Sequence, residues 1–288
     1  MLTLETITSA LVKHPEGLSY SQIMATTKLS NSVVWDCIRS SNEFVKRDNK
    51  YFLKKYNLLL DKCENRKGLK NYSLEYFQRL SDWSHCCGHA EKRIGTYRTK
   101  SGNAFDYDSK TELKILKYLD RTDFVIAIGG QNFLIPYSTD FADNKKYYPD
   151  IVIYTSTHHI IFIEVKSIAN MSYHLNLSKY EALKRFCKQK GYGYTMVDPD
   201  SNYTTIEELK NEPKSFLLQN IIAENFFYSK LKFNKQDVDE WYTRYRLQSL
   251  FENREQYYNA IRAIIIRNNW YNRKEFGFEV TYKPVKAK

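Results

Sequence analysis

Three charged residues interrupt two of the most apolar stretches of the chain. Asp150 comes directly before one apolar run, and Glu164 and Lys166 come at the end of the next. Burying an ionised group is costly unless a metal, a partner or a function compensates for it. Because side chains alternate along a strand, Glu164 and Lys166 would share one face while Val165 points into the core. If the two runs pair as strands, Asp150, Glu164 and the Val165 carbonyl could hold a hard cation such as Mg²⁺ beside the ammonium.

The elements around these residues must bring them together. Apolar residues at helical spacing predict an amphipathic helix over 109–119, in which Ser109 and Glu112 have the spacing of a capping box. Strands are expected at 124–128, 133–137, 147–154 and 160–166, with a polar turn at 140–146 and a helix at 177–189. Helices that alternate with strands predict an α/β fold for this part of the chain.

The order of these residues resembles the PD-(D/E)xK nuclease superfamily. Pro149-Asp150 is followed, after thirteen intervening residues, by Glu164-Val165-Lys166. Over residues 105–198 the sequence looks more narrowly like the TnsA-type transposition endonuclease domain. The residues that carry this second resemblance are 107–112, Gln131, 148–150, 164–166, 176–179 and 191–193. The sequence departs from that family in having Asn132 after Gln131 where Pro is usual.

The resemblance implies a restriction-endonuclease-like core with a mixed central sheet. Its activity would be hydrolysis of a phosphodiester bond in double-stranded DNA with Mg²⁺, for which Mn²⁺ would substitute. Asp150, Glu164 and the backbone carbonyl of Val165 would hold the metal, and Glu112 would complete the metal shell or position a second ion.

The same resemblance implies roles for two further catalytic residues. Lys166 would orient or help to deprotonate the attacking water and stabilise the developing negative charge. Gln131 would hold the site from the neighbouring strand. A TnsA-like enzyme would also be expected to need a protein partner that gates its activity.

Residues 1–56 predict a winged helix-turn-helix domain that resembles the HARE-type variety. Three short helices precede a basic β-hairpin around residues 48–50, and Ser19 and Ser30 can cap the second and third helices. The third helix and the wing would offer Asn31, Ser32, Trp35, Arg39, Lys46, Arg47 and Lys50 to DNA. Domains of this kind also serve as protein–protein modules, and that alternative stays open.

The remaining chain divides into three further parts. We expect a helical connector over 57–103, the nuclease core over 104–200 and a basic, mainly helical domain over 201–288. In the last part, the arginines could grip a DNA backbone, or Trp241, Tyr242, Tyr245 and Phe251 could form the surface of a homodimer. In the nuclease core, Lys145, Lys146 and Lys179 are phosphate contacts or part of a solvated face.

Composition narrows the class of protein. The chain of 288 residues has 44 Lys and Arg against 33 Asp and Glu, a formal net charge of +11, which favours a polyanionic partner. Its apolar runs are far shorter than the roughly 20 residues that span a bilayer. The first residues lack a signal-peptide pattern, and the cysteines number five, so a reduced cytoplasmic protein is expected. The isolated run 85–89, His-Cys-Cys-Gly-His, lacks the paired spacing of a zinc site.

Two other functions remain open at this level. The first is a type II-like restriction endonuclease, which would leave ends of fixed sequence. The second belongs to a different class, a DNA-binding regulator whose nuclease-like fold is only a scaffold.

Overall fold

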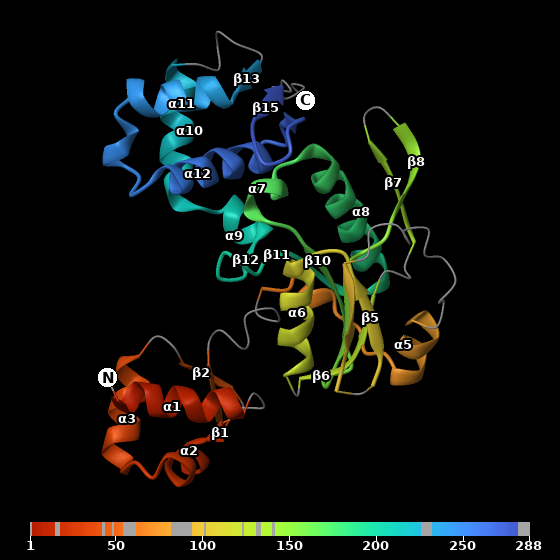
Figure 1. The fold of residues 1–288 in the computed structure, drawn as a ribbon, viewed down its shortest axis with the longest axis vertical. Coiled ribbons are helices and arrows are strands. Elements are labelled where there is room, and N and C mark those ends of the chain that lie inside the picture. The colour runs from red at the N-terminus through yellow and green to blue at the C-terminus, as the bar shows by residue number, and fades with distance from the viewer. Residues whose placement is uncertain are drawn as a thin grey trace.

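The computed structural model describes residues 2–14, 18–41, 44–47, 49–53, 62–81, 94–100, 102–122, 124–130, 134–139, 142–225 and 232–281. It contains an N-terminal helical unit, a central mixed sheet with helices on both faces, and a C-terminal helical unit (Figure 1). Within the described ranges, no helix is long and apolar enough to cross a membrane.

The N-terminal unit contains the expected three helices and hairpin. They are α1 (Leu2–Lys13), α2 (Tyr20–Thr27), α3 (Asn31–Ser40), β2 (Phe44–Arg47) and β3 (Lys50–Leu53), with a short strand β1 (Leu18–Ser19) that pairs with β3. Ser19 caps α2 in a reciprocal capping box with Gln22. Ser30 occupies the N-cap position of α3, but its side chain makes no capping hydrogen bond. The unit has a small core of its own, built around Ile7, Leu11 and Ile23.

The central sheet has five strands in the order β12-β11-β10-β9-β6. Their bounds are β6 (Val125–Gly129), β9 (Ile151–Thr155), β10 (Ile160–Val165), β11 (Gly193–Asp198) and β12 (Thr204–Thr205). Strand β10 is parallel to β11 and antiparallel to β9, and the remaining pairings are antiparallel. The centre of the chain is therefore the mixed α/β sheet that the sequence predicts.

Helices cover the two faces of this sheet because its strands are apolar on both sides. Helix α6 (Lys110–Asp120) packs Ile115, Leu116 and Leu119 against the face that carries Ile161 and Ile163. Helix α8 (His174–Lys190) covers the other face with Tyr180, Leu183 and Cys187. The short helix α7 (Ile168–Met171) connects β10 to α8.

Part of the segment expected to be a connector packs on the same core. It contains η2 (Arg66–Gly68), α5 (Leu74–Ser81) and β4 (Gly95–Arg98), and β4 pairs with β5 (Ala104–Tyr107), which follows the segment. Phe77 of α5 is 1% exposed in the main core. The Glu64 N–H donates to the Tyr194 carbonyl at 2.8 Å, so the chain before η2 lies along β11. The run 85–89 lies outside the described residues.

One local prediction is wrong between residues 133 and 154. The expected polar turn at 140–146 is largely a strand, β8 (Ala142–Tyr147), which pairs with β7 (Ile135–Thr139). The expected strand 147–154 is divided, because β8 ends at Tyr147 and β9 begins at Ile151. The two-stranded hairpin projects beside α8 (Figure 1), and its solvated position explains why β8 is polar.

The C-terminal unit is helical with a small sheet. Its elements are α9 (Ile206–Lys210), α10 (Pro213–Asn225), β13 (Lys232–Asn234), α11 (Lys235–Arg244), η3 (Leu247–Ser249), α12 (Arg254–Arg267), β14 (Tyr271–Asn272) and β15 (Glu279–Thr281). Trp241 and Phe251 are each 2% exposed in its core, so these two residues cannot form the dimer surface that the sequence allowed. Arg262 is 4% exposed, which removes it from the arginines that could grip DNA.

Candidate active site

The pairing of β9 with β10 brings Asp150 to Lys166. Ile151 lies opposite Ile163 in this antiparallel pair, so Asp150, directly before β9, lies beside the end of β10. The Asp150 Oδ2 atom accepts a hydrogen bond from the Val165 N–H at 2.8 Å. This bond fixes the carboxylate against the backbone of the Glu164–Lys166 segment.

The Lys166 ammonium lies among oxygen atoms from three residues. Its Nζ atom is 2.7 Å from Glu164 Oε1, 3.1 Å from Asp150 Oδ2 and 3.0 Å from the Val165 carbonyl oxygen. The Lys166 N–H donates to the Val197 carbonyl at 3.1 Å, which continues the β10–β11 pairing. Burial alone would lower the pKa of this ammonium, but the two carboxylates outweigh burial and raise it, so Lys166 is charged.

Glu164 is held from a second direction by a residue to which the sequence assigned no role. The Tyr147 hydroxyl, at the end of β8, donates a hydrogen bond to Glu164 Oε2, while Lys166 binds Oε1. Glu164 is 1% exposed, and burial followed by the negative charge of Asp150 raises its pKa. Both hydrogen bonds act in the opposite direction and favour the ionised carboxylate.

Glu112 is the third carboxylate of the cluster. It lies in the first turn of α6, where its Oε2 atom accepts from the Asp108 N–H at 3.0 Å and its Oε1 atom accepts from the Ser109 hydroxyl at 2.9 Å. Burial raises the pKa of Glu112 to about 7, with a further contribution from the negative charge of Asp150. Lys166 acts on it in the opposite direction, so all four ionisable groups share one electrostatic environment.

The donor set fits a hard divalent cation by its chemistry. Carboxylates and a backbone carbonyl are the oxygen ligands that such ions accept, and mutual repulsion among the three carboxylates is relieved when a cation lies between them. In the arrangement described, Lys166 is the cation that balances them. Across the ranges that the structure describes, no three His, Cys, Asp or Glu side chains are already arranged to hold a metal ion.

The other predicted site residues lie in several places. Gln131 is outside the described residues, as is the side chain of Arg47. The residues with exposed side chains are Asn31, Ser32, Trp35, Arg39, Lys46 and Lys146. Lys145 and Lys179 are partly buried, and the Lys179 ammonium lies 5.8 Å from the centre of the Tyr147 ring. Lys179 therefore lies beside the cluster, whereas the first five exposed residues belong to the N-terminal unit.

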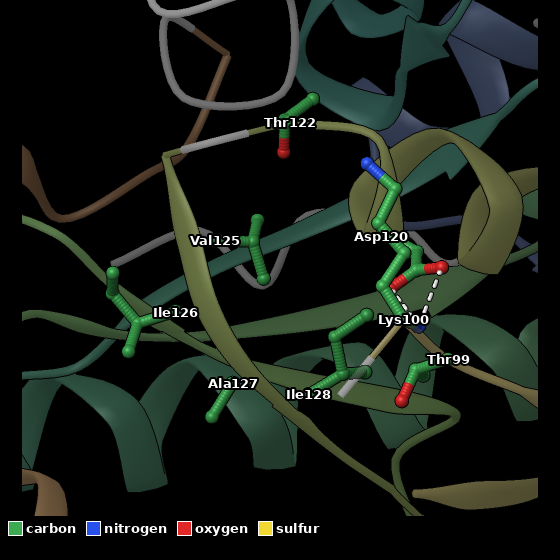
Figure 2. A pocket seen from close by; sticks show the side chains of 8 residues that line it. All are labelled: Thr99, Lys100, Asp120, Thr122, Val125, Ile126, Ala127 and Ile128. Carbon is green, nitrogen blue, oxygen red and sulfur yellow. Dashed lines mark hydrogen bonds between the residues drawn. The ribbon is translucent and has the colours of Figure 1, made fainter. Parts of the chain in front are cut away.

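A small pocket of about 290 Å³ at the edge strand β6 is separate from this cluster. Its eight lining residues, shown in Figure 2, include none of the predicted site residues. The Asp120 carboxylate there accepts a hydrogen bond from the Lys100 N–H at 3.1 Å and from the Tyr97 hydroxyl at 2.8 Å. Those bonds satisfy the Asp120 carboxylate within the chain itself.

The comparison with protein families points to the same part of the chain. Residues 122–198 match the family model described as the TnsA-like endonuclease N terminal. The matched region runs from the start of β6 to the end of β11, so it includes Asp150, Glu164 and Lys166 but not Glu112. No curated protein matches the chain. The match supports a relationship between this region and TnsA-like nucleases.

Proposed function

We propose that the protein is a divalent-metal-dependent DNA endonuclease with a PD-(D/E)xK core. The observation that carries the proposal is the convergence of Asp150, Glu164 and Lys166 at one end of a mixed sheet, within the region that matches a TnsA-like endonuclease. The buried carboxylates and the ammonium are retained in an otherwise apolar core, which is expected where charged groups serve chemistry.

In this proposal the carboxylates hold the metal. Asp150, Glu164 and the Val165 carbonyl would bind Mg²⁺, and Glu112 would complete the set; Mn²⁺ would substitute for Mg²⁺. The metal would supply Lewis acidity at a phosphate oxygen and lower the pKa of a bound water. Gln131 would assist from the chain that follows β6.

Lys166 is assigned the role of stabilising the negative charge that would develop on the phosphate. With Asp150 and Glu164 engaged in holding a metal, the Lys166 ammonium would be available to donate to a phosphate oxygen or to the attacking water. In the metal-free arrangement, Asp150 and Glu164 raise the pKa of Lys166 and keep the proton on Nζ, so Lys166 is a hydrogen-bond donor before a metal binds.

The N-terminal unit is proposed to be a winged helix that contacts DNA. On α3, the side chains of Asn31, Ser32 and Arg39 are exposed, and Trp35 is 50% exposed. An exposed face with polar and basic groups suits a recognition helix, and Lys46 extends it into the hairpin. Lys145 and Lys146 of β8 would contact phosphates nearer the cluster.

The proposed role is DNA cleavage in transposition or in another process of mobile elements, in the cytoplasm. Double-stranded DNA would be the substrate, a homodimer would make paired cuts, and a protein partner would gate the activity. The test is to incubate the purified protein with plasmid DNA and Mg²⁺ or Mn²⁺ and to sequence the ends. Ends without a fixed sequence are expected, whereas one fixed sequence would favour a restriction endonuclease.

One observation favours a second function. The ion pairs of Lys166 with Asp150 and Glu164 balance the buried charges within the chain, which a non-catalytic DNA-binding regulator would also require. Under that alternative, Mg²⁺ would not change DNA affinity and the DNA would stay intact.

Tyr147→Phe tests the proposed metal site, because Tyr147 positions the proposed metal ligand Glu164. The substitution keeps the ring but removes the hydroxyl that holds Glu164 Oε2. Loss of a hydrogen bond to a metal ligand typically costs about 10–100-fold in metal affinity or activity. We expect the Mg²⁺ concentration for half-maximal cleavage to rise at least tenfold, with a smaller change in the rate at saturating Mg²⁺.

The matched control is Tyr137→Phe, because Tyr137 is also buried and lies on the partner strand β7. It should leave the Mg²⁺ requirement unchanged. An equal Mg²⁺ requirement for Tyr147→Phe and the wild type would show that the hydroxyl does not position Glu164.

A further inference from the structure

A basic groove lies beside β11, apart from the carboxylate cluster. It has a volume of about 560 Å³. Its cationic lining residues are Arg66, Lys67, Lys184, Lys188 and Lys210. Two acidic residues, Glu64 and Glu207, also line it. The groove therefore combines side chains from the η2 segment, α8 and α9 into one surface with an excess of positive charge.

The two acidic groups in the groove offset only part of the charge of its five cations. The Glu64 carboxylate accepts a hydrogen bond from the Tyr180 hydroxyl, and burial raises the pKa of Glu64. Glu207 forms an ion pair with Lys210 at 3.5 Å on the same helix, and such exposed pairs are weak. An anionic ligand could replace that contact at low cost.

The chain that carries Arg66 and Lys67 is fixed to the sheet. Besides the bond from the Glu64 N–H to Tyr194, the Asn65 side chain donates to the Tyr192 carbonyl at 2.9 Å. The Lys70 N–H donates to the Gly191 carbonyl at 2.9 Å. Because its backbone is held on both sides, η2 presents its cations without a large cost of ordering on binding.

The groove is close enough to the cluster for one duplex to reach both. Tyr194, which lines the groove, pairs with Phe162, and Lys166 is four residues further along β10. At about 3.3 Å per residue this is about 13 Å along the strand. One turn of B-DNA covers about 34 Å, so a duplex cleaved at the cluster would have phosphates within reach of the groove.

We propose that this basic groove binds the phosphodiester backbone of duplex DNA on one side of the cleavage point. The inference rests on the proposed function, which makes DNA the substrate. A duplex carries a negative charge about every 1.7 Å along its axis, which suits cations contributed by three separate elements. The ligand is therefore a row of phosphate groups, which the groove would bind independently of the base sequence.

The test measures the salt dependence of binding with three exposed residues of the groove replaced together, Arg66→Gln, Lys67→Gln and Lys188→Gln. Binding of the full-length protein to a labelled 30-base-pair duplex, about three helical turns, is followed by fluorescence anisotropy over a series of KCl concentrations, with EDTA to prevent cleavage. Each lost phosphate contact lowers the slope of log Kd against log salt by about 0.9. We expect the slope to fall by about 2 to 3, with weaker binding at low salt.

The control removes the same charge elsewhere, with Lys100→Gln, Lys117→Gln and Arg121→Gln, which are exposed residues outside both the groove and the terminal units. This control should keep the wild-type slope, and circular dichroism should show that both variants are folded. An unchanged slope in the groove variant would overturn the proposal and direct attention to an acidic protein as the ligand. So would a wild-type protein that does not bind DNA.

Cleavage by the wild type with Mg²⁺ is scored separately. A reduced slope in a protein that neither cleaves DNA nor binds Mn²⁺ by calorimetry would support the groove and reject the nuclease. Cleavage with an unchanged slope would support the nuclease and reject the groove.

Discussion

Lys166→Ala is expected to lower the rate of DNA cleavage by about 100- to 10,000-fold, since a charged donor in the chemical step typically contributes about 10²–10⁴-fold. The Lys166 ammonium is bound to Asp150, Glu164 and the Val165 carbonyl, and no other lysine or arginine is paired with these carboxylates among the described residues. DNA affinity should change only a few-fold, because binding is expected to be spread over the basic parts of the chain before and after the central sheet. The measurement is single-turnover cleavage at saturating Mg²⁺, with affinity measured in EDTA.

The fold must survive for this result to be informative. Removing one member of a buried ion pair can cost about 3–5 kcal/mol of stability, because the remaining charge is unpaired. Lys166→Met keeps most of the stem, and Mg²⁺ would itself neutralise the carboxylates, so both variants should be melted with and without the metal. Lys117→Ala, on the exposed side of α6, is the matched control and should cleave normally. A wild-type rate in folded Lys166→Ala would remove Lys166 from the chemical step.

A second large effect is expected from pH. The pKa of Glu112 is raised to about 7 by burial and then by the charge of Asp150, so the free protein carries a neutral Glu112 below that pH. Metal binding requires the ionised carboxylate, so the apparent Mg²⁺ affinity should be constant above pH 7. Below it, affinity should fall by up to about tenfold per pH unit for one competing proton. Glu164, whose pKa is also raised, would steepen the fall.

The same group gives a stability signature of opposite sign in the absence of metal. Folded Glu112 binds its proton more tightly than the unfolded chain does, because its ordinary pKa is 4.5. The metal-free protein should therefore lose stability as pH rises from about 4.5 to about 7 and change little above that range.

Calorimetric Mg²⁺ titrations from pH 5.5 to 8.5 and thermal melts over pH 4.5–8.5 check both effects. Glu112→Gln removes the titrating group: it should bind Mg²⁺ more weakly at pH 8 and lose the dependence near pH 7. Identical pH profiles for the wild type and Glu112→Gln would exclude Glu112 from the metal set.

The sequence was informative wherever a short-range rule applied. Alternation along a strand placed Glu164 and Lys166 together, and pairing of two apolar runs placed Asp150 beside them. The Ser109 cap predicted the start of α6 and the position of Glu112 within one residue. These features depend on neighbours in the chain or on one strand pairing.

Features that depend on distant contacts could not be found in this way. The contact between Tyr147 and Glu164 joins β8 to β10, and one more tyrosine among 24 gives no signal of its own. Only its position, three residues before Asp150, could have suggested a role. Strand β8 of the polar hairpin is expected to be a turn because its side chains lack the apolar alternation of a strand that covers a core. The packing of Phe77 on the central sheet is likewise a tertiary contact without a local pattern.

The measurement that tests the central claim most directly compares wild-type protein with Asp150→Ala on supercoiled plasmid, in Mg²⁺ and in Mn²⁺. Asp150 contacts both the Val165 N–H and the Lys166 ammonium. Its loss should therefore disable the site without changing the parts of the chain that are proposed to bind DNA. We predict nicked or linear plasmid with the wild type and intact plasmid with Asp150→Ala, although both proteins bind the DNA. Equal cleavage by the two proteins would contradict the assignment. An uncut plasmid with both proteins would also contradict it, if calorimetry detected no binding of Mn²⁺ to the wild type.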